Sequence, residues 1–259
     1  MKLHFLTLLL AGLLISPLPL VAQEEAAGQS AEEQAMENLP QWLIDFSNLP
    51  TETREQYVAH FNLAKQAYHK GEWVECIAQL AACEIIMRGN PSIWNLRASC
   101  LLEQKYFAEA EAEIKRVLEV QPNDPVTLMN LANVHMACGR YAESLAIVTR
   151  LREDLYLMHK EDDLLYALDY RALLCHLMLG NMAEAKAIAA SVSPVADTPL
   201  YHYAKAAIAL VEGKRSVAAH NLNLAKLIFA NNQAYVPYER SLKLSGLPEK
   251  TEPPQPAQP

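Results

Sequence analysis

Apolar residues recur three to four positions apart through most of the chain, which is the spacing that places them on one face of an α-helix. Upstream of Gly139, Leu128 and Leu131 follow this spacing, and downstream Tyr141 and Val148 follow it again. Glycine tolerates the left-handed backbone at which a helix stops, so Gly139 marks a break between two helices. The pattern predicts a unit made of a helix, a tight turn and a second helix.

This unit is repeated. The stretch GRYAESLAIV at 139–148 closely matches GEWVECIAQL at 71–80, and KYFAEAEAEI begins halfway between them at 105. The period is therefore about 34 residues. Two weaker copies, GNMAEAKAIA and GKRSVAAHNL, begin at 180 and 213. A glutamate occupies the same position in four of the five copies: Glu75, Glu109, Glu143 and Glu184.

The residue after the glutamate is small in most copies, which lets two helices approach closely. Prolines at 91, 122 and 125 separate one helix pair from the next. The spacing from Gly139 to Gly180 exceeds the period by about two helical turns, and we expect the extra residues near 152–165.

A 34-residue helix-turn-helix period resembles the tetratricopeptide repeat (TPR) family. The resemblance covers about residues 57–231 and is strong over the first three repeats, although Arg97 departs from the family's leucine. It implies an all-α fold, a right-handed α-solenoid of about five repeats near 57–90, 91–124, 125–158, 166–198 and 199–231, with a capping helix at 233–246. The residues that carry it are Leu63, Ala64, Gly71 and Trp73, then Trp94, Ala98, Phe107, Ala110 and Pro122, then Leu131, Ala132, Gly139 and Tyr141.

The two ends of the chain differ from the repeats. Residues 1–22 have a lysine, a short apolar run and a small residue at Ala22, which is typical of a secretory signal peptide. An uncleaved membrane anchor is the alternative. Residues 23–38 are acidic and predict a flexible linker, and residues 248–259 are rich in proline and predict a disordered tail. The folded solenoid is expected at 39–247.

Composition and motifs exclude several functions. The formal net charge of −8 and the absence of a basic cluster argue against a nucleic-acid partner. No nucleophile motif or phosphate-binding glycine loop is present, so we expect no enzyme, no catalytic residue and no cofactor. His135 and Cys138 share a helix face, but nothing near them completes a metal site.

Five cysteines are present, and all lie within predicted helices. Cys76 and Cys83 are two turns apart on one helix, too far to form a disulfide with each other. We interpret the cysteines as buried structural thiols. A bridge from Cys83 to Cys100, on the next helix, is the alternative.

The resemblance implies that the first helices of the repeats line a concave groove that binds a partner protein. Its first part is mixed in character, with Phe61, Lys65 and Ser99, and its second part is apolar. Three alternatives explain the apolar part: the C-terminal segment covers it, a partner peptide or helix binds there, or two copies associate through it. The expected partner-binding residues are Asn95, Met129, Asn133, Met136, Tyr170, Leu174, Leu177, Met178, Tyr203 and Leu210.

The family also contains grooves that hold the carboxylate tails of heat-shock chaperones with basic residues. Phe61, Leu96 and Val126 stand at positions that such a clamp would use, which excludes that role. We expect a non-catalytic scaffold or adaptor in the bacterial cell envelope, in contact with the membrane only through its transient signal peptide. A periplasmic chaperone or assembly factor for secreted or outer-membrane proteins is the alternative.

Overall fold

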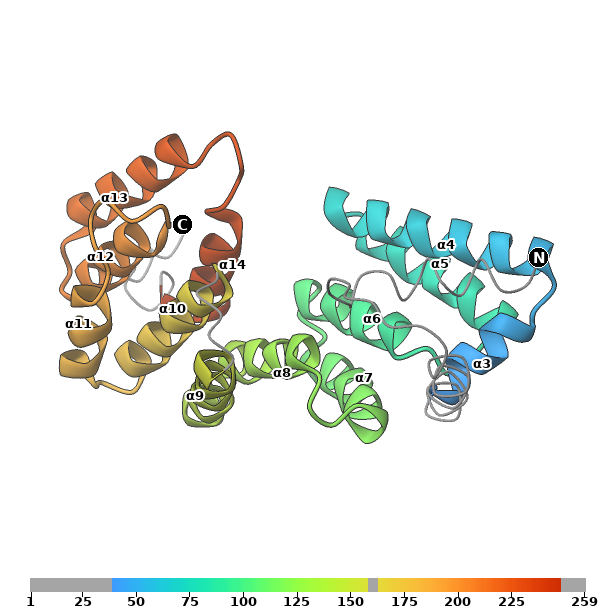
Figure 1. Cartoon of the computed structure of the whole chain (residues 1–259). Helices are drawn as coiled ribbons and strands as arrows, with labels where there is room; N and C mark the ends of the chain where they lie inside the picture. The colour runs from blue at the N-terminus through green and yellow to red at the C-terminus, as the bar shows by residue number, and fades with distance from the viewer. Residues whose placement is uncertain (1–38, 158–162, 248–259) are drawn as a thin grey trace, which may run out of the picture. The chain divides into compact units, whose positions relative to one another are not determined.

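A computed structural model describes residues 39–157 and 163–247. The predicted signal peptide, the acidic linker at 23–38 and the proline-rich tail lie outside these residues. Within the described residues every regular element is an α-helix, twelve in all, which confirms the all-α prediction (Figure 1). No helix within the described ranges combines the length and the apolar character that crossing a membrane requires.

The chain divides into two units, Met1–Leu49 and Pro50–Pro259. The first contains helix α3 (Gln41–Asn48), which follows Pro40 and has no fully buried residue. The second contains all the other described helices: α4 (Thr51–Lys70), α5 (Trp73–Ile86), α6 (Pro91–Glu103), α7 (Phe107–Val120), α8 (Pro125–Ala137), α9 (Tyr141–Leu157), α10 (Asp163–Met178), α11 (Met182–Ala190), α12 (Leu200–Val211), α13 (Arg215–Ile228) and α14 (Val236–Leu244).

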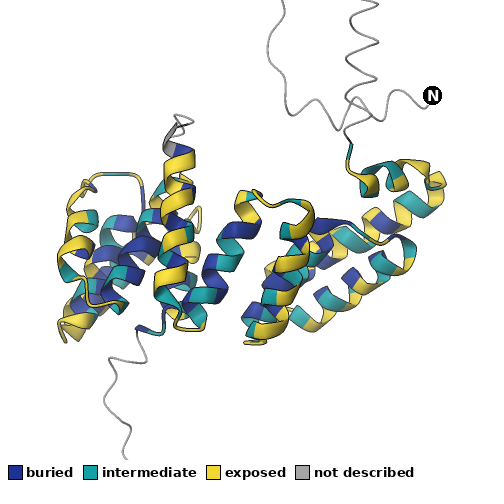
Figure 2. Ribbon diagram, turned by 90° about the horizontal axis from the view of Figure 1, so that it is seen from below, coloured by how far each residue is buried: buried dark blue, intermediate teal, exposed yellow. Residues whose placement is uncertain are grey.

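The helices of the second unit pack in sequential pairs. The pairs are α4 with α5, α6 with α7, α8 with α9, α10 with α11 and α12 with α13, and the second helix of each pair also packs on the first helix of the next pair. Figure 2 shows the buried positions, in dark blue, along the faces that neighbouring helices turn toward each other. This arrangement is a TPR-like solenoid, as the repeat predicted.

The turn inside each pair has the left-handed backbone that the glycine position predicted. Gly71 has φ of +77°, and its N–H and that of Glu72 donate to carbonyls in the last turn of α4. The second repeat has Lys105 in place of glycine, and Lys105 adopts φ of +64° with the same bonding pattern. A residue with a Cβ atom is strained in this conformation, so the turn geometry overrides the side chain's preference.

The glutamate of the repeat lies in the first turn of the second helix in four pairs. Glu75, Glu109, Glu143 and Glu184 are in the first turns of α5, α7, α9 and α11. A helix N-terminus carries partial positive charge on its unpaired N–H groups, so a carboxylate there stabilises the helix. This explains why the same acidic position recurs.

The small position after the glutamate is buried in every repeat. Its five occupants, Cys76, Ala110, Ser144, Ala185 and Ala218, are 0–1% exposed. At Ala110 the neighbours are Ala98 and Leu102 of α6 together with Ile114 and Val134. The prediction of a close helix–helix contact at this position is confirmed.

The third pair departs from the others in length. Helix α9 has 17 residues, whereas α5 and α7 have 14 each, and the next described residue after α9 is Asp163. The longer helix agrees with added residues near 152–165, although positions 158–162 of that insertion lie outside the described residues.

The C-terminal helix α14 does not stack on the last pair as a further repeat would. It packs instead on the first helices α8, α10 and α12 (Figure 1). An ion pair between Lys226 and Glu239, with 2.8 Å between Nζ and Oε1, joins it to α13, and Ala225 of α13 lies in the same buried cluster as Tyr238 and Leu242. The chain therefore turns back after α13 and covers its own earlier repeats.

Replacing Ala110 by leucine is expected to overpack the contact between α6 and α7 and to lower the free energy of unfolding by roughly 1–3 kcal/mol. Ala112→Leu, on the exposed side of the same helix, should change it by less than about 0.5 kcal/mol. Urea denaturation of both variants measures the difference, and equal stabilities would show that the repeat register is wrong.

Candidate functional site

The surface formed by the first helices has two parts, and α14 covers the apolar one. Tyr170 of α10, Tyr203 of α12 and Tyr238 of α14 form a three-ring cluster, with ring centroids 5.3–5.7 Å apart. Tyr170 and Tyr203 are fully buried and Tyr238 is 5% exposed. These three residues are called the tyrosine cluster below. Burial raises the pKa of Tyr238 to about 12, so its hydroxyl stays neutral at physiological pH.

Hydrogen bonds fix α14 over this surface at several points. The hydroxyls of Tyr238 and Thr198 are 3.1 Å apart, and the hydroxyl of Tyr141 donates to the Ser245 carbonyl over 2.9 Å. Leu242 and Leu247 complete the buried cluster beneath the helix. The C-terminal segment is therefore part of the core of the last three repeats.

A second set of polar contacts extends α14 toward the earlier repeats. Arg240 pairs with Glu103, at the end of α6, with 2.5 Å between Nε and Oε1. Arg171 of α10 is almost fully buried, donates to the side chain of Asn133 over 3.0 Å and to the Ala167 carbonyl over 2.9 Å, and has its pKa lowered to about 10 by burial. These contacts tie α6, α8, α10 and α14 into one structure.

The ten expected partner-binding residues fall into three groups. Met136, Tyr170, Leu174, Leu177 and Tyr203 are buried in one cluster with residues of the C-terminal segment, and Met178 and Leu210 pack against that cluster. While α14 stays in place, no partner reaches the buried members. Asn133 is buried against Arg171, and Met129 packs on the core between α8 and α9. Asn95 lines a cavity between α4, α6 and α8.

The open part of the first-helix surface lies at the N-terminal repeats. A cavity of about 370 Å³ is bounded by α4, the first half of α6, the end of α7 and the start of α8. We call it the α4–α8 groove. Its lining residues are Phe61, Lys65, Pro91, Ser92, Asn95, Leu96, Ser99, Val117, Gln121, Asp124, Val126, Thr127 and Asn130.

Two amide side chains in the lining of the α4–α8 groove are joined to each other. The side chain of Asn130 donates to Oδ1 of Asn95 over 2.7 Å and to Oγ of Ser99 over 3.3 Å. Asn95 keeps its own amide donors and Asn130 its own acceptor, so each can bond to a peptide backbone as well. Apolar side chains also line the groove, and among them Val126 is 61% exposed. The ammonium of Lys65 lies 5.0 Å from the centroid of the Phe61 ring.

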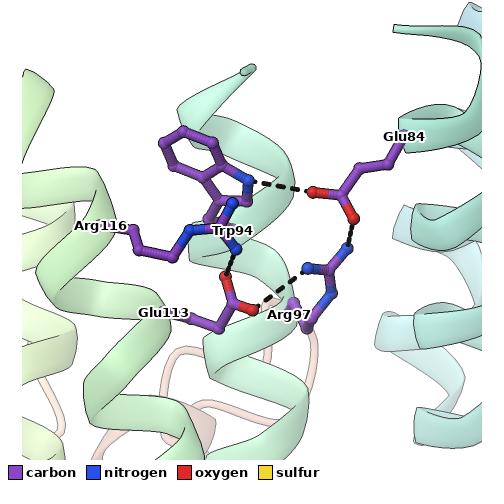
Figure 3. A network of polar contacts seen from close by, with 5 residues as sticks. All are labelled: Glu84, Trp94, Arg97, Glu113 and Arg116. Atoms are coloured by element: carbon purple, nitrogen blue, oxygen red, sulfur yellow. Dashed lines mark hydrogen bonds and ion pairs between the residues drawn. The ribbon is translucent and has the colours of Figure 1, made fainter. Parts of the chain in front are cut away.

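A network of five side chains holds α6 in place beside the groove (Figure 3). Arg97 pairs with Glu84 of α5 over 2.5 Å and with Glu113 of α7 over 3.2 Å, and the indole N–H of Trp94 donates to Glu84 over 3.0 Å. Arg116 pairs with Glu113 and stacks over the Trp94 ring, 4.3 Å from its centroid. None of the five lines the cavity, so the network positions α6 without occupying its groove face.

Arg97 is the residue that departs from the family's leucine, and the network explains its presence. Its side chain is 14% exposed and meets carboxylates from the helices on both sides. Within the described residues, no three His, Cys, Asp or Glu side chains gather closely enough to hold a metal ion, and His135 and Cys138 gain no third ligand.

Comparisons with known proteins agree with this architecture. Residues 101–156 match the family model of the tetratricopeptide repeat. The crystal structure of a tetratricopeptide repeat protein from Parabacteroides merdae is similar, with 18% identity, a TM-score of 0.54, and coverage of 84% of this chain and 80% of that chain. The TPR domain of P58(IPK) matches with 14% identity and a TM-score of 0.33, over 88% of this chain and 71% of that chain. No curated protein matches the sequence.

Residues 101–156 therefore match the tetratricopeptide repeat, and the similar crystal structure shows that the chain has a TPR-like solenoid fold. TPR domains generally bind other proteins and are typically non-catalytic. Asn130, which lines the α4–α8 groove and bonds to Asn95 and Ser99, was not among the residues predicted to bind a partner. The available signal was the first asparagine in α8, 35 residues after Asn95 and so one position beyond the repeat period.

Replacing Tyr238 by alanine is expected to lower the free energy of unfolding by about 3–5 kcal/mol, because it removes a buried ring from the tyrosine cluster. Val236→Ala on the same helix, where the side chain is 45% exposed, should cost less than about 0.5 kcal/mol. Chemical denaturation compares the two variants, and a Tyr238→Ala cost no larger than that of Val236→Ala would contradict the packing of α14.

Proposed function

We propose that the chain is a non-catalytic scaffold or adaptor that binds a segment of a partner protein in the α4–α8 groove. The observation that carries this proposal is the contrast between the two parts of the first-helix surface. The chain's own helix fills the apolar part, whereas the part with Asn95, Asn130 and Val126 remains open.

The lining indicates what kind of segment fits. A cavity of about 370 Å³ holds a few side chains and not a folded domain. The amides of Asn95 and Asn130 suit a peptide backbone, and the exposed side chain of Val126 and the half-buried side chain of Leu96 suit apolar residues of the ligand. Lys65 adds one positive charge at the edge, so a carboxylate next to the apolar residues would favour binding.

The adaptor role is favoured over the chaperone role by the position of α14. A chaperone with many clients needs a broad apolar surface, and the broad apolar surface of this chain is buried under α14. The same burial removes that surface from self-association. A small groove with fixed amides supports selective binding of one partner.

We also propose that the protein acts in the bacterial cell envelope. This rests on residues 1–22, whose lysine, short apolar run and Ala22 fit a signal peptide. The chain would then meet its partner after export, and the membrane would contact only the transient signal segment.

Val126→Glu tests the groove directly. A carboxylate among apolar lining residues must lose water when a ligand binds, so capture of the partner should fall at least about tenfold. Val120→Glu is the matched control, because Val120 is 57% exposed on α7 and does not line the cavity.

Both variants should keep the stability of the wild type, since both positions face solvent. The measurement is a crosslinking pull-down from the native envelope with the three proteins at equal concentration. A partner retained equally by wild type and Val126→Glu would rule out the α4–α8 groove as its binding site.

Intact-mass measurement of protein purified from the native host tests the location. We expect the mature chain to lack about 22 N-terminal residues. A mature protein that still begins at Met1 would contradict cleavage and leave the envelope location without support.

A further inference from the structure

The polar groups of the α4–α8 groove favour a ligand that is rich in hydrogen-bond acceptors. The side-chain amides of Asn95 and Gln121 line the groove and donate to no group within the described part of the chain. Lys65 also lines it and meets no carboxylate among the described residues. Asp124, at the same surface, is already bonded to the backbone N–H and the hydroxyl of Thr127 over 2.8 and 2.5 Å. The groove therefore offers open donors and a positive charge to a ligand.

Residues 248–259, with the sequence PEKTEPPQPAQP, have the composition of such a ligand. Five of the twelve residues are proline, which carries a carbonyl acceptor but no N–H donor. Two glutamates and one lysine give the segment a net negative charge. Its backbone can therefore accept hydrogen bonds from the amides of the groove, and its charge complements Lys65.

The order of residues in this segment also suits the groove. The polyproline conformation has three residues per turn, so Pro253 and Pro256 would share one face while Glu252 lies on another. Proline rings on such a face pack against aromatic and apolar side chains in the grooves that recognise them. Val126, which is 61% exposed, offers such a surface, and Lys65 can meet Glu252 at the edge.

The chain leaves α14 within reach of the groove. Leu244 of α14 packs on the core cluster that contains Leu102 of α6. Asn95 lies seven residues before Leu102 on the same helix, which is about 10 Å along its axis. The six residues that lead from Leu247 to Pro253 span about 19 Å in the polyproline conformation, so the proline run can reach Asn95.

We propose that residues 248–259 occupy the α4–α8 groove of their own chain in an extended conformation. The assignment rests on the proposed function of the groove as a peptide-binding site, and it names the class of ligand as a proline-rich segment that carries a carboxylate. A partner segment then binds by displacing these residues. The chain's own segment thus sets the affinity that a partner must exceed.

Photocrosslinking in the full chain tests where the segment binds. Val126 is replaced by the photoreactive residue p-benzoylphenylalanine, and the protein is irradiated and digested with trypsin. Cleavage gives the peptide 117–140, which contains position 126, and the peptide 251–259. We expect these two peptides to be linked in protein that runs as a monomer on a denaturing gel. The same photoreactive residue in place of Ile85, which is 86% exposed and does not line the groove, should give no link to 251–259.

Three outcomes of the crosslinking experiment would overturn the proposal. The first is no link from position 126 to the peptide 251–259. The second is equal linking from positions 126 and 85, which would mean that the segment has no preferred site. The third is a link found only in the dimer band, which would show that the segment of a second copy binds in the groove.

Competition gives a second readout. The full-chain variant with Pro253→Gly, Pro254→Gly and Pro256→Gly should lose the segment's binding, and the probe is a fluorescent peptide with the sequence of residues 248–259. A tethered segment has an effective concentration on the order of 1 mM and competes with the free peptide. Fluorescence anisotropy should therefore show binding to the glycine variant at least about threefold tighter than to the wild type. Equal Kd values for the two proteins would contradict occupation of the groove by its own chain.

The two proposals fail in different ways. If position 126 gives no link to 251–259 but Val126→Glu still loses the partner in the pull-down, the present inference is overturned and the groove remains a partner site. If the link forms and Val126→Glu keeps its partner, the segment occupies the groove as inferred and the proposed function of the groove is wrong.

Discussion

The packing of Tyr238 against Tyr170 and Tyr203 is the interaction on which the rest of the structure depends. The first helices of the last three repeats carry a continuous apolar surface, and leaving it in water would forgo about 25 cal/mol for each Å². Helix α14 brings one further ring, and pairs of rings at 5.3–5.7 Å add about 0.5–1.5 kcal/mol each beyond area burial. The solenoid therefore ends by folding back on itself.

This closure divides one surface into two parts with different roles. Under α14 the surface is core, with Leu174 and Leu177 buried beside the tyrosine cluster. Beyond its reach, Asn95 and Asn130 remain at an open groove whose lining mixes amides with apolar side chains. Polar contacts keep the parts aligned, because Arg240 reaches Glu103 at the end of α6 while Arg97 holds α6 between its neighbours. The C-terminal helix thus helps to determine which surface a partner can use.

The sequence predicted local features well and long-range contacts poorly. The turn at Gly71 and the buried position of Ala110 follow from backbone conformation and side-chain size, which a repeat shows directly. Periodicity also located the apolar surface and the C-terminal helix. Periodicity could not predict that the C-terminal helix covers the apolar surface, because a helical pattern indicates which face of a helix is apolar but not which element packs on that face.

Hydrogen exchange of the backbone amides, measured by mass spectrometry on the full chain, tests the position of α14 most directly. If α14 is part of the core, its amides from Tyr238 to Leu244 should exchange as slowly as those of α10 and α12, because all three helices open only together. If α14 exchanges as fast as an unfolded peptide while α10 and α12 remain protected, the helix does not cover the apolar surface. In that case the apolar residues from Tyr170 to Leu210 would be open to a partner, and the division of the surface into core and groove would be wrong.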